Sequence, residues 1–179
     1  MYGLIIEGIK VYVVTQFGED VWEKIVDRLE NKVQKEESFT GNSIYSESLP
    51  LDIANATSQV LGLSLETVLE KCGEYFIAQY VQNLGYDEMI QIVGRHLRDF
   101  LNGLDNLHEY LRFSFPHIKA PSFFCVNEGR KGLTLQYRSK RDGYIHYVKG
   151  LSKGLQVNFI KLNLKSNFFA KMKLRGSTI

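Results

Sequence analysis

His108 is the side chain whose type and spacing best fit a cofactor ligand in this sequence. It lies in a segment where apolar residues recur every three or four positions, so on a helix its imidazole points toward the core. A lone histidine on such a face is usually a core residue with a hydrogen-bonded partner, and that interpretation stays open. The alternative is an axial haem ligand, because haem needs one neutral imidazole against an apolar cavity. The stripe consists of Val93, Leu97, Leu101, Leu104, His108 and Leu111.

A row of hydrogen-bond donors follows in the last third of the chain. Tyr137, Ser139 and Arg141 alternate in a segment with strand periodicity, so they share one strand face. A phenol, a hydroxyl and a guanidinium all donate hydrogen bonds, and arginine pairs bidentately with carboxylates. Such a row suits the two propionates of haem. A strand end with a solvated run of charge is the other interpretation.

The elements that must position these residues change period along the chain. The first two-thirds predict helices, and a polar segment from Asn31 to Ser48 predicts a loop. Ser64 is a weak helix cap. The helical segments are Val21–Leu29, Pro50–Leu61, a segment that begins at Ser64, and Met89–Leu111.

The last third predicts a small antiparallel sheet with a short helix. Residues 132–141 alternate as a strand does, and Asp142 with Gly143 signals a turn. A short helix is predicted from Tyr144 to Leu151, and a weak alternation from Leu155 to Leu164 predicts a further strand. The fold class is therefore α+β, with helices first and a small sheet after them.

Composition excludes several classes of protein. A formal charge of +2 is too small to indicate a nucleic-acid partner, although acidic residues end at Asp142 and the tail is basic. Cys72 and Cys125 form no CxxC pair, so no zinc site or disulfide framework is predicted. The N-terminal segment lacks the features of a signal peptide, and no apolar run is long enough for a transmembrane segment. A cytoplasmic location is expected.

The motifs resemble those of one family. The Y-x-S-x-R of Tyr137, Ser139 and Arg141 resembles the propionate-binding signature of the H-NOX (haem nitric oxide/oxygen binding) family. His108 and the later Pro121 are similar to its proximal histidine and haem-contacting proline. Matching flanks resemble the start of a soluble guanylate cyclase beta-type subunit, closest to the atypical invertebrate class. These flanks are MYG at the start, VWE at 21–23, GYD at 85–87 and DFLNGLDNLHEYL at 99–111.

The resemblance implies a fold, a cofactor and an activity. The family has a helical N-terminal lobe and a mixed C-terminal lobe around one haem b. His108 would be the iron ligand, Pro121 would press on the porphyrin, and Tyr137, Ser139 and Arg141 would hold the propionates. Nitric oxide would weaken the iron–histidine bond, and the freed helix would signal to a cyclase domain that makes cyclic GMP from GTP. The partner would be a cyclase subunit, in a homo- or heterodimer.

Two positions depart from the family pattern. Tyr147 stands where nitric-oxide-selective cyclases carry an aliphatic residue; in the oxygen-binding branch, a tyrosine there donates a hydrogen bond to oxygen. This implies a distal gas pocket that includes Tyr147 and Phe76, with oxygen and carbon monoxide as further ligands. An aromatic core residue beside Tyr144 is the alternative. After Gly154 the sequence no longer resembles the family, so residues 1–154 are expected to form the haem domain and 155–179 a separate basic segment with an incomplete sheet.

Other functions remain open. The chain contains no motif of a cyclase active site, so it is expected to be a regulatory module of an enzyme. One rival is a haem-free H-NOX-like module for dimerisation or docking. Another is a stand-alone small protein whose basic tail binds an acidic partner or a membrane.

Overall fold

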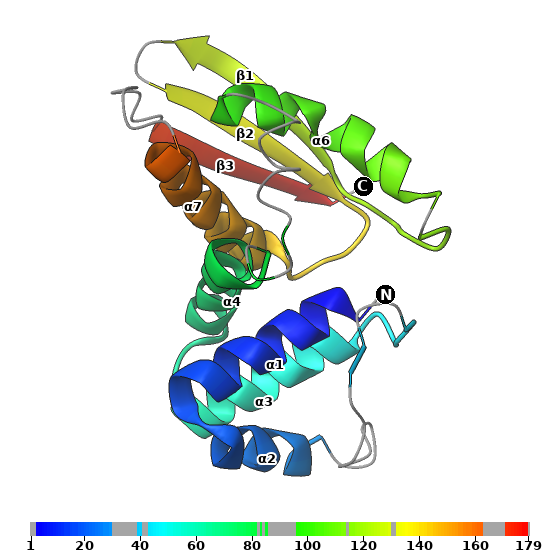
Figure 1. The fold of residues 1–179 in the computed structure, drawn as a ribbon, viewed down its shortest axis with the longest axis vertical. Helices are drawn as coiled ribbons and strands as arrows, with labels where there is room; N and C mark the ends of the chain where they lie inside the picture. Colours follow the sequence, from blue (N-terminus) through cyan, green and yellow to red (C-terminus); the bar gives the residue numbers. More distant parts are fainter. Residues whose placement is uncertain are drawn as a thin grey trace.

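The computed structural model describes most of the chain. The described residues are 3–29, 39–40, 43–81, 83, 85, 96–113, 115–129, 132–162 and 171–178. They form two lobes, and the helices of residues 65–75 and 145–162 lie side by side where the lobes meet (Figure 1).

Helices α1 (Leu4–Phe17), α2 (Glu19–Asp27), α3 (Leu49–Leu61) and α4 (Leu65–Tyr75) form the described part of the N-terminal lobe. Local sequence explains their ends. Gly18, at φ 96°, turns the chain between α1 and α2, and Pro50 stands in the first turn of α3. Ser64 caps α4 by accepting a hydrogen bond from the backbone N–H of Thr67 at 3.2 Å, so the predicted cap is confirmed. The helices pack around a buried core that includes Ile9, Trp22, Ile25, Ile53 and Leu69.

A π-helix, η1 (Phe76–Val81), continues directly from α4. The π turn widens the helix at Phe76, and this residue packs against the N-terminal core. Phe76 packs against α1 at Gly8, where a Cβ atom would lie 2.6 Å from its ring. The aromatic ring therefore takes the space that a larger residue on α1 would need.

The C-terminal lobe packs a helix on a three-stranded sheet. Helix α6 (Leu97–Leu111) covers β1 (Ser122–Gly129) and β2 (Gly132–Ser139), as Figure 1 shows. Phe100 and Leu101 of the helix form a second core with Leu133 and Leu135 of the sheet. The predicted alternation of β2 is confirmed, because Leu133, Leu135, Tyr137 and Ser139 are buried in turn.

The sheet is mixed in direction. Strand β1 pairs antiparallel with β2, whereas β3 (Lys171–Thr178) pairs parallel with β2. The sequence predicted β2 but neither β1 nor β3, and the parallel pairing of β3 differs from the antiparallel sheet that was expected. The α+β fold class is confirmed, and the sheet order β1-β2-β3 leaves β1 at an edge.

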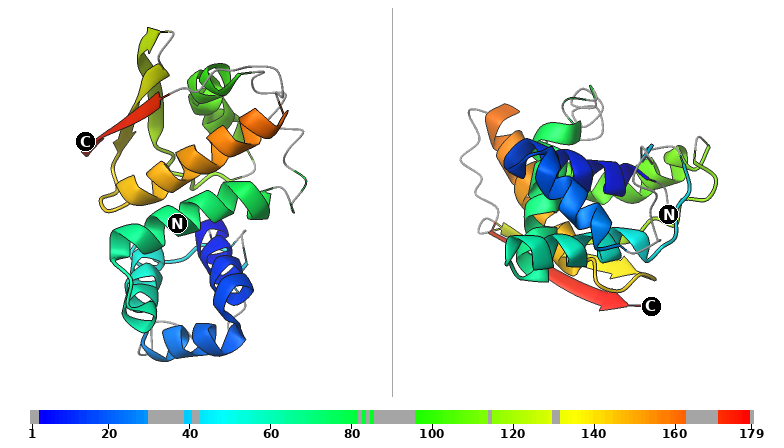
Figure 2. Two further views of the ribbon diagram at one scale, coloured as in Figure 1. Left: turned by 90° about the vertical axis from the view of Figure 1, so that its left-hand side faces the viewer. Right: turned by 90° about the horizontal axis from the view of Figure 1, so that it is seen from below.

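Helix α7 (Ile145–Leu162) packs on the cores of both lobes: Tyr147 lies in the first core and Leu155 in the second. It lies beside α4 between the N-terminal helices and the sheet (Figure 2, left). The prediction of a strand from Leu155 to Leu164 is wrong for the described part, which is helical to Leu162. The stripe Val148, Leu151, Ser152 and Leu155 explains this, because its helical spacing buries Leu155 while Val157 is exposed. The helix also runs without interruption through Gly154.

Helices α4 and α7 cross at very short range because three glycines meet there. A Cβ atom on Gly73 would overlap the carbonyl oxygen of Tyr147, and one on Gly150 would overlap the carbonyl oxygen of Glu70. At Gly154 it would lie 2.8 Å from the carbonyl oxygen of Glu74. The missing side chains let the two backbones touch.

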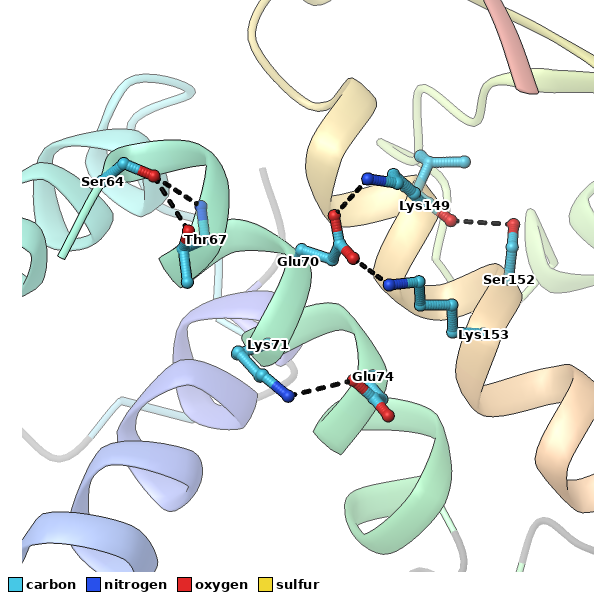
Figure 3. A network of polar contacts seen from close by, with 9 residues as sticks. Ser64, Thr67, Glu70, Lys71, Glu74, Lys149, Ser152 and Lys153 are labelled. Carbon is cyan, nitrogen blue, oxygen red and sulfur yellow. Dashed lines mark hydrogen bonds and ion pairs between the residues drawn. The ribbon is translucent and has the colours of Figure 1, made fainter. Parts of the chain in front are cut away.

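Ion pairs flank this crossing on one side (Figure 3). The Glu70 carboxylate contacts Lys149 at 2.7 Å and also bonds Lys153 through its other oxygen. Both lysines lie on α7, so a single side chain of α4 spans one turn of the partner helix. Hydrogen bonds from the two lysines lower the pKa of Glu70.

In the part of the chain that the structure describes, no helix has the length and apolarity needed to span a membrane.

Candidate functional site

His108 lies on the side of α6 that faces the edge strand β1. Asn102, Asp105 and His108 are three residues apart and share this face. The carboxylate of Asp105 accepts a hydrogen bond from the backbone N–H of Phe123 at 3.1 Å, and the amide oxygen of Asn102 accepts one from Cys125 at 3.4 Å. An edge strand has backbone groups without a neighbouring strand, so α6 supplies partners to β1 and is fixed beside it.

Burial keeps the His108 imidazole neutral. The side chain is partly exposed, and desolvation lowers its pKa, against the opposing effects of the Asp105 charge and the Pro121 carbonyl. Its Nδ1 atom is buried and makes no hydrogen bond of acceptable geometry to any described residue. A neutral imidazole is the form that ligates metals.

The ring of Phe123 lies between His108 and the donor row on β2. The imidazole lies 6.2 Å from the ring of Phe123, and Phe123 lies 5.6 Å from the ring of Tyr137, with interplanar angles of 39° and 35°. Phe123 and Tyr137 are also direct partners in the β1–β2 register. The structure therefore brings the predicted ligand close to the predicted donor row, with Phe123 between them.

The donor row itself is assembled as the sequence predicted, with one difference. Tyr137 and Ser139 lie on the buried face of β2, but Arg141 follows the strand in a bend. The backbone N–H of Arg141 donates to Ser139 Oγ at 2.9 Å, which keeps the bend close to the strand end. Burial raises the pKa of Tyr137, while its hydrogen bond with Ser139 and the Arg141 charge lower it, so all three side chains interact.

Arg141 is held by groups from two other segments. Its Nη1 atom donates to the backbone carbonyl of Lys119 at 2.6 Å, and its Nη2 atom lies 3.7 Å from Oε1 of Glu47. Lys119 Nζ contacts the same carboxylate oxygen at 2.7 Å. The hydrogen bond from Lys119 and the charge of Arg141 lower the pKa of Glu47, so its carboxylate is ionised at neutral pH. The Nε atom of Arg141 is buried and has no hydrogen-bond partner among the described residues.

Phe76 and Tyr147 form a separate pair on the N-terminal side. Their ring centroids are 6.2 Å apart in an edge-on arrangement, and Tyr147 is buried in the N-terminal core together with Tyr144. Burial raises the pKa of Tyr144 to about 12, which keeps that phenol protonated, and the Arg141 charge opposes the rise. The predicted distal residues are thus brought together, in contact with the aromatic core.

The residues present fit a haem. Haem would need a neutral imidazole for iron and hydrogen-bond donors for two carboxylates. His108 provides the first, and Tyr137, Ser139 and Arg141 provide the second. Buried polar atoms without partners are rare in folded proteins, and Arg141 Nε is such an atom among the described residues. The described residues contain no cluster of three or more His, Cys, Asp or Glu that could hold a metal ion by themselves.

Sequence reasoning missed several residues of this site. The i, i+3 spacing of Asn102 and Asp105 before His108 was a usable signal, because it places two hydrogen-bonding side chains on one helix face. Glu47 and Lys119 gave no such signal, since they are 72 residues apart and meet only in the fold. Val93 and Met89 of the predicted helical segment lie outside the described residues.

Comparison with known proteins agrees with this geometry. The family model described as Haem-NO-binding matches residues 2–167. The chain is 40% identical over 150 residues to soluble guanylate cyclase gcy-31 of Caenorhabditis elegans, a match over 84% of this chain and 21% of that protein. It is 34% identical over 166 residues to soluble guanylate cyclase 89Da of Drosophila melanogaster, over 93% of this chain and 24% of that protein. The chain thus spans about a quarter or less of these relatives.

Solved structures show the same fold. An H-NOX protein from S. oneidensis in the Fe(II)NO ligation state superposes with a TM-score of 0.75 at 19% identity, over 89% of this chain and 85% of that one. A Cs H-NOX mutant with an unnatural amino acid superposes with a TM-score of 0.73 at 19% identity, over 89% and 82% of the two chains.

Proposed function

Because this chain belongs to the haem-NO-binding (H-NOX) family, a family of haem gas-sensing domains, we propose that it binds haem b through His108 and senses nitric oxide. The observation that carries the proposal is the neutral imidazole of His108 beside β1, connected through Phe123 to the donor row on β2. When bound, haem iron supplies the site at which a diatomic gas binds.

The proposed roles of the side chains follow from their chemistry. His108 ligates the iron, and Pro121, whose carbonyl lies by the imidazole, contacts the porphyrin. Tyr137, Ser139 and Arg141 hold the propionates: each carries a hydrogen-bond donor, and Ser139 Oγ accepts from the Arg141 backbone, which keeps these two residues together. A charge-assisted hydrogen bond contributes about 1.5–3 kcal/mol and a neutral one about 0.5–1.5 kcal/mol. Of the three side chains, Arg141 is therefore expected to contribute most to the affinity for haem.

Signalling would begin at α6. This helix carries His108 and is attached to β1 by the side chains of Asp105 and Asn102. A change in the pull on His108 would act on these two hydrogen bonds before it acted on the rest of the sheet. We propose that the movement regulates a guanylate cyclase that makes cyclic GMP from GTP, in a cytoplasmic homo- or heterodimer of cyclase subunits. The support is the likeness to soluble guanylate cyclases over a small part of their length.

Tyr147 bears on which gas is bound. Its phenol is a hydrogen-bond donor in an apolar surrounding beside Phe76. A donor favours oxygen over nitric oxide or carbon monoxide, by about 1–2 kcal/mol or roughly tenfold in affinity. We therefore include oxygen among the ligands, and carbon monoxide as a further diatomic gas that gains less from the donor. If this is correct, the ferrous protein forms an oxygen complex in air and Tyr147→Phe loses most of it while it still binds nitric oxide, as stopped-flow dissociation rates will show.

A visible spectrum tests the main proposal. Purified protein supplied with haem is expected to show a Soret band, and His108→Gly is expected to lose haem unless imidazole is added. His117→Gly is the matched control, because this histidine lies in the loop before the strand and should not affect haem retention. Normal haem retention in His108→Gly without imidazole contradicts the assignment. If the parent protein shows no Soret band, a haem-free dimerisation or docking module is the better explanation.

A further inference from the structure

The guanidinium of Arg141 is fixed on one side by groups that no haem carboxylate would supply. Lys119 offers its backbone carbonyl to Nη1 at 2.6 Å, and Glu47 places Oε1 3.7 Å from Nη2. These two atoms come from the loop before β1 and from the segment before α3. Two separate parts of the chain therefore meet on the terminal nitrogens of one side chain.

The opposite part of the same guanidinium has no partner. Nε is buried without a hydrogen-bond partner among the described residues, although the side chain as a whole is 18% exposed. The Arg141 charge also acts on the phenols of Tyr137 and Tyr144, so the group lies next to the buried face of the donor row. Nε therefore lacks an acceptor in a side chain that the proposed function assigns to the porphyrin carboxylates.

On this basis we propose that Glu47 is a positioning residue: with the Lys119 carbonyl it holds the terminal nitrogens of Arg141 and so directs Nε toward a porphyrin carboxylate. This inference rests on the proposed function, because it concerns the carboxylate-binding side of that site.

The charges around Glu47 explain why it positions Arg141 and does not occupy the carboxylate site. Lys119 holds the shared oxygen at 2.7 Å, whereas Arg141 lies 3.7 Å from it. This ammonium keeps the Glu47 carboxylate on the outer side, where its side chain is 47% exposed. A second carboxylate can then approach Nε without displacing the first.

A metal-free porphyrin tests the inference without the iron–histidine bond. The probes are protoporphyrin IX and its dimethyl ester, whose affinities for the whole chain are measured by porphyrin fluorescence. Glu47→Gln keeps the shape of the side chain and removes its charge. We expect it to weaken binding of the free acid about threefold to tenfold and to leave the ester unchanged, a fraction of the larger loss expected from Arg141→Ala. Asp20→Asn is the matched control, because it removes an exposed carboxylate from an ion pair with Lys24 elsewhere.

The other outcomes overturn the inference in distinguishable ways. An equal loss for acid and ester means that Glu47 supports only the fold. Tighter binding of the free acid by Glu47→Gln means that Glu47 competes for the carboxylate site. If Arg141→Ala discriminates between acid and ester but Glu47→Gln does not, the inference alone fails. If neither variant discriminates, Arg141 does not bind a porphyrin carboxylate and its proposed role fails as well. If the parent binds neither porphyrin, the inference fails, and the Soret band of the protein supplied with haem decides the proposed function separately.

Discussion

Replacing Gly150 with alanine is the sharpest test of how α4 and α7 cross. The added Cβ would overlap the carbonyl oxygen of Glu70 and would lie 2.8 Å from the backbone nitrogen of Glu74. Both are backbone atoms, so no side-chain rotation can relieve the overlap. The helices would have to separate by roughly 1 Å in an interior that is otherwise close-packed.

The size of the effect follows from two opposing contributions. Alanine in a helix interior gains about 1 kcal/mol over glycine. Overpacking costs about 1–3 kcal/mol, and we take the upper value because the overlap is with backbone. The net expectation is a loss of about 2 kcal/mol in the free energy of unfolding. For a chain of this size that corresponds to a fall in Tm of about 4–8 °C.

Chemical denaturation in urea, followed by circular dichroism, measures this loss. Gly129→Ala is the matched control, because a Cβ there would meet no atom within 4 Å. The control is expected to change stability little, whereas Gly150→Ala lowers the midpoint. If Gly150→Ala is as stable as the parent or more stable, then the two backbones are not in contact and our account of the lobe junction is incorrect.

Three further predictions concern single side chains. Asp105→Ala removes the hydrogen bond to the Phe123 backbone; the loss is about 1–2 kcal/mol of stability, and hydrogen exchange should become faster at that amide. Hydrogen bonds from two lysines of α7 lower the folded-state pKa of Glu70 below its ordinary value. The stabilising effect of Glu70 is therefore present at neutral pH and is lost as the pH falls through the folded pKa. Glu70→Gln should therefore destabilise the protein by about 0.5–1 kcal/mol at neutral pH and by less at about pH 3. Urea titrations at both pH values measure the difference, and an equal effect at the two would contradict this prediction. Cys72 is buried, and burial raises the pKa of its thiol to about 12. Treatment with a thiol reagent at mildly alkaline pH, followed by peptide mapping, should therefore find Cys72 unmodified in the folded protein and modified in urea. Modification of Cys72 in the native protein would show that the core opens.

Local signals were sufficient where one element alone decides the structure. The cap at Ser64, the start of α3 near Pro50 and the alternation of β2 each depend on neighbours in sequence, and all three were predicted. His108 was singled out for the same reason, because it lies on the apolar stripe of α6. These residues could be interpreted without knowledge of the rest of the chain.

The failures have a common physical origin in contacts between distant segments. Leu155 fits both a strand alternation and a helical stripe, and only the packing of α7 against Ile77 and the second core decides for the helix. Strand β3 is defined by its pairing with β2, which a weak local pattern does not encode. Glu47 acquires its place only because the fold brings it to Lys119 and Arg141.

The attachment of α6 to β1 also sets an energy scale for any movement of His108. Asp105 and Asn102 each make one hydrogen bond to the strand edge, which together contribute about 1–3 kcal/mol. A ligand shifts an equilibrium between two states only by the difference in its affinity for them. Each 1.4 kcal/mol changes the equilibrium constant about tenfold. The two bonds thus lower the population of a detached helix by roughly fivefold to 140-fold. This contribution adds to the burial of Phe100 and Leu101, which also holds α6 on the sheet.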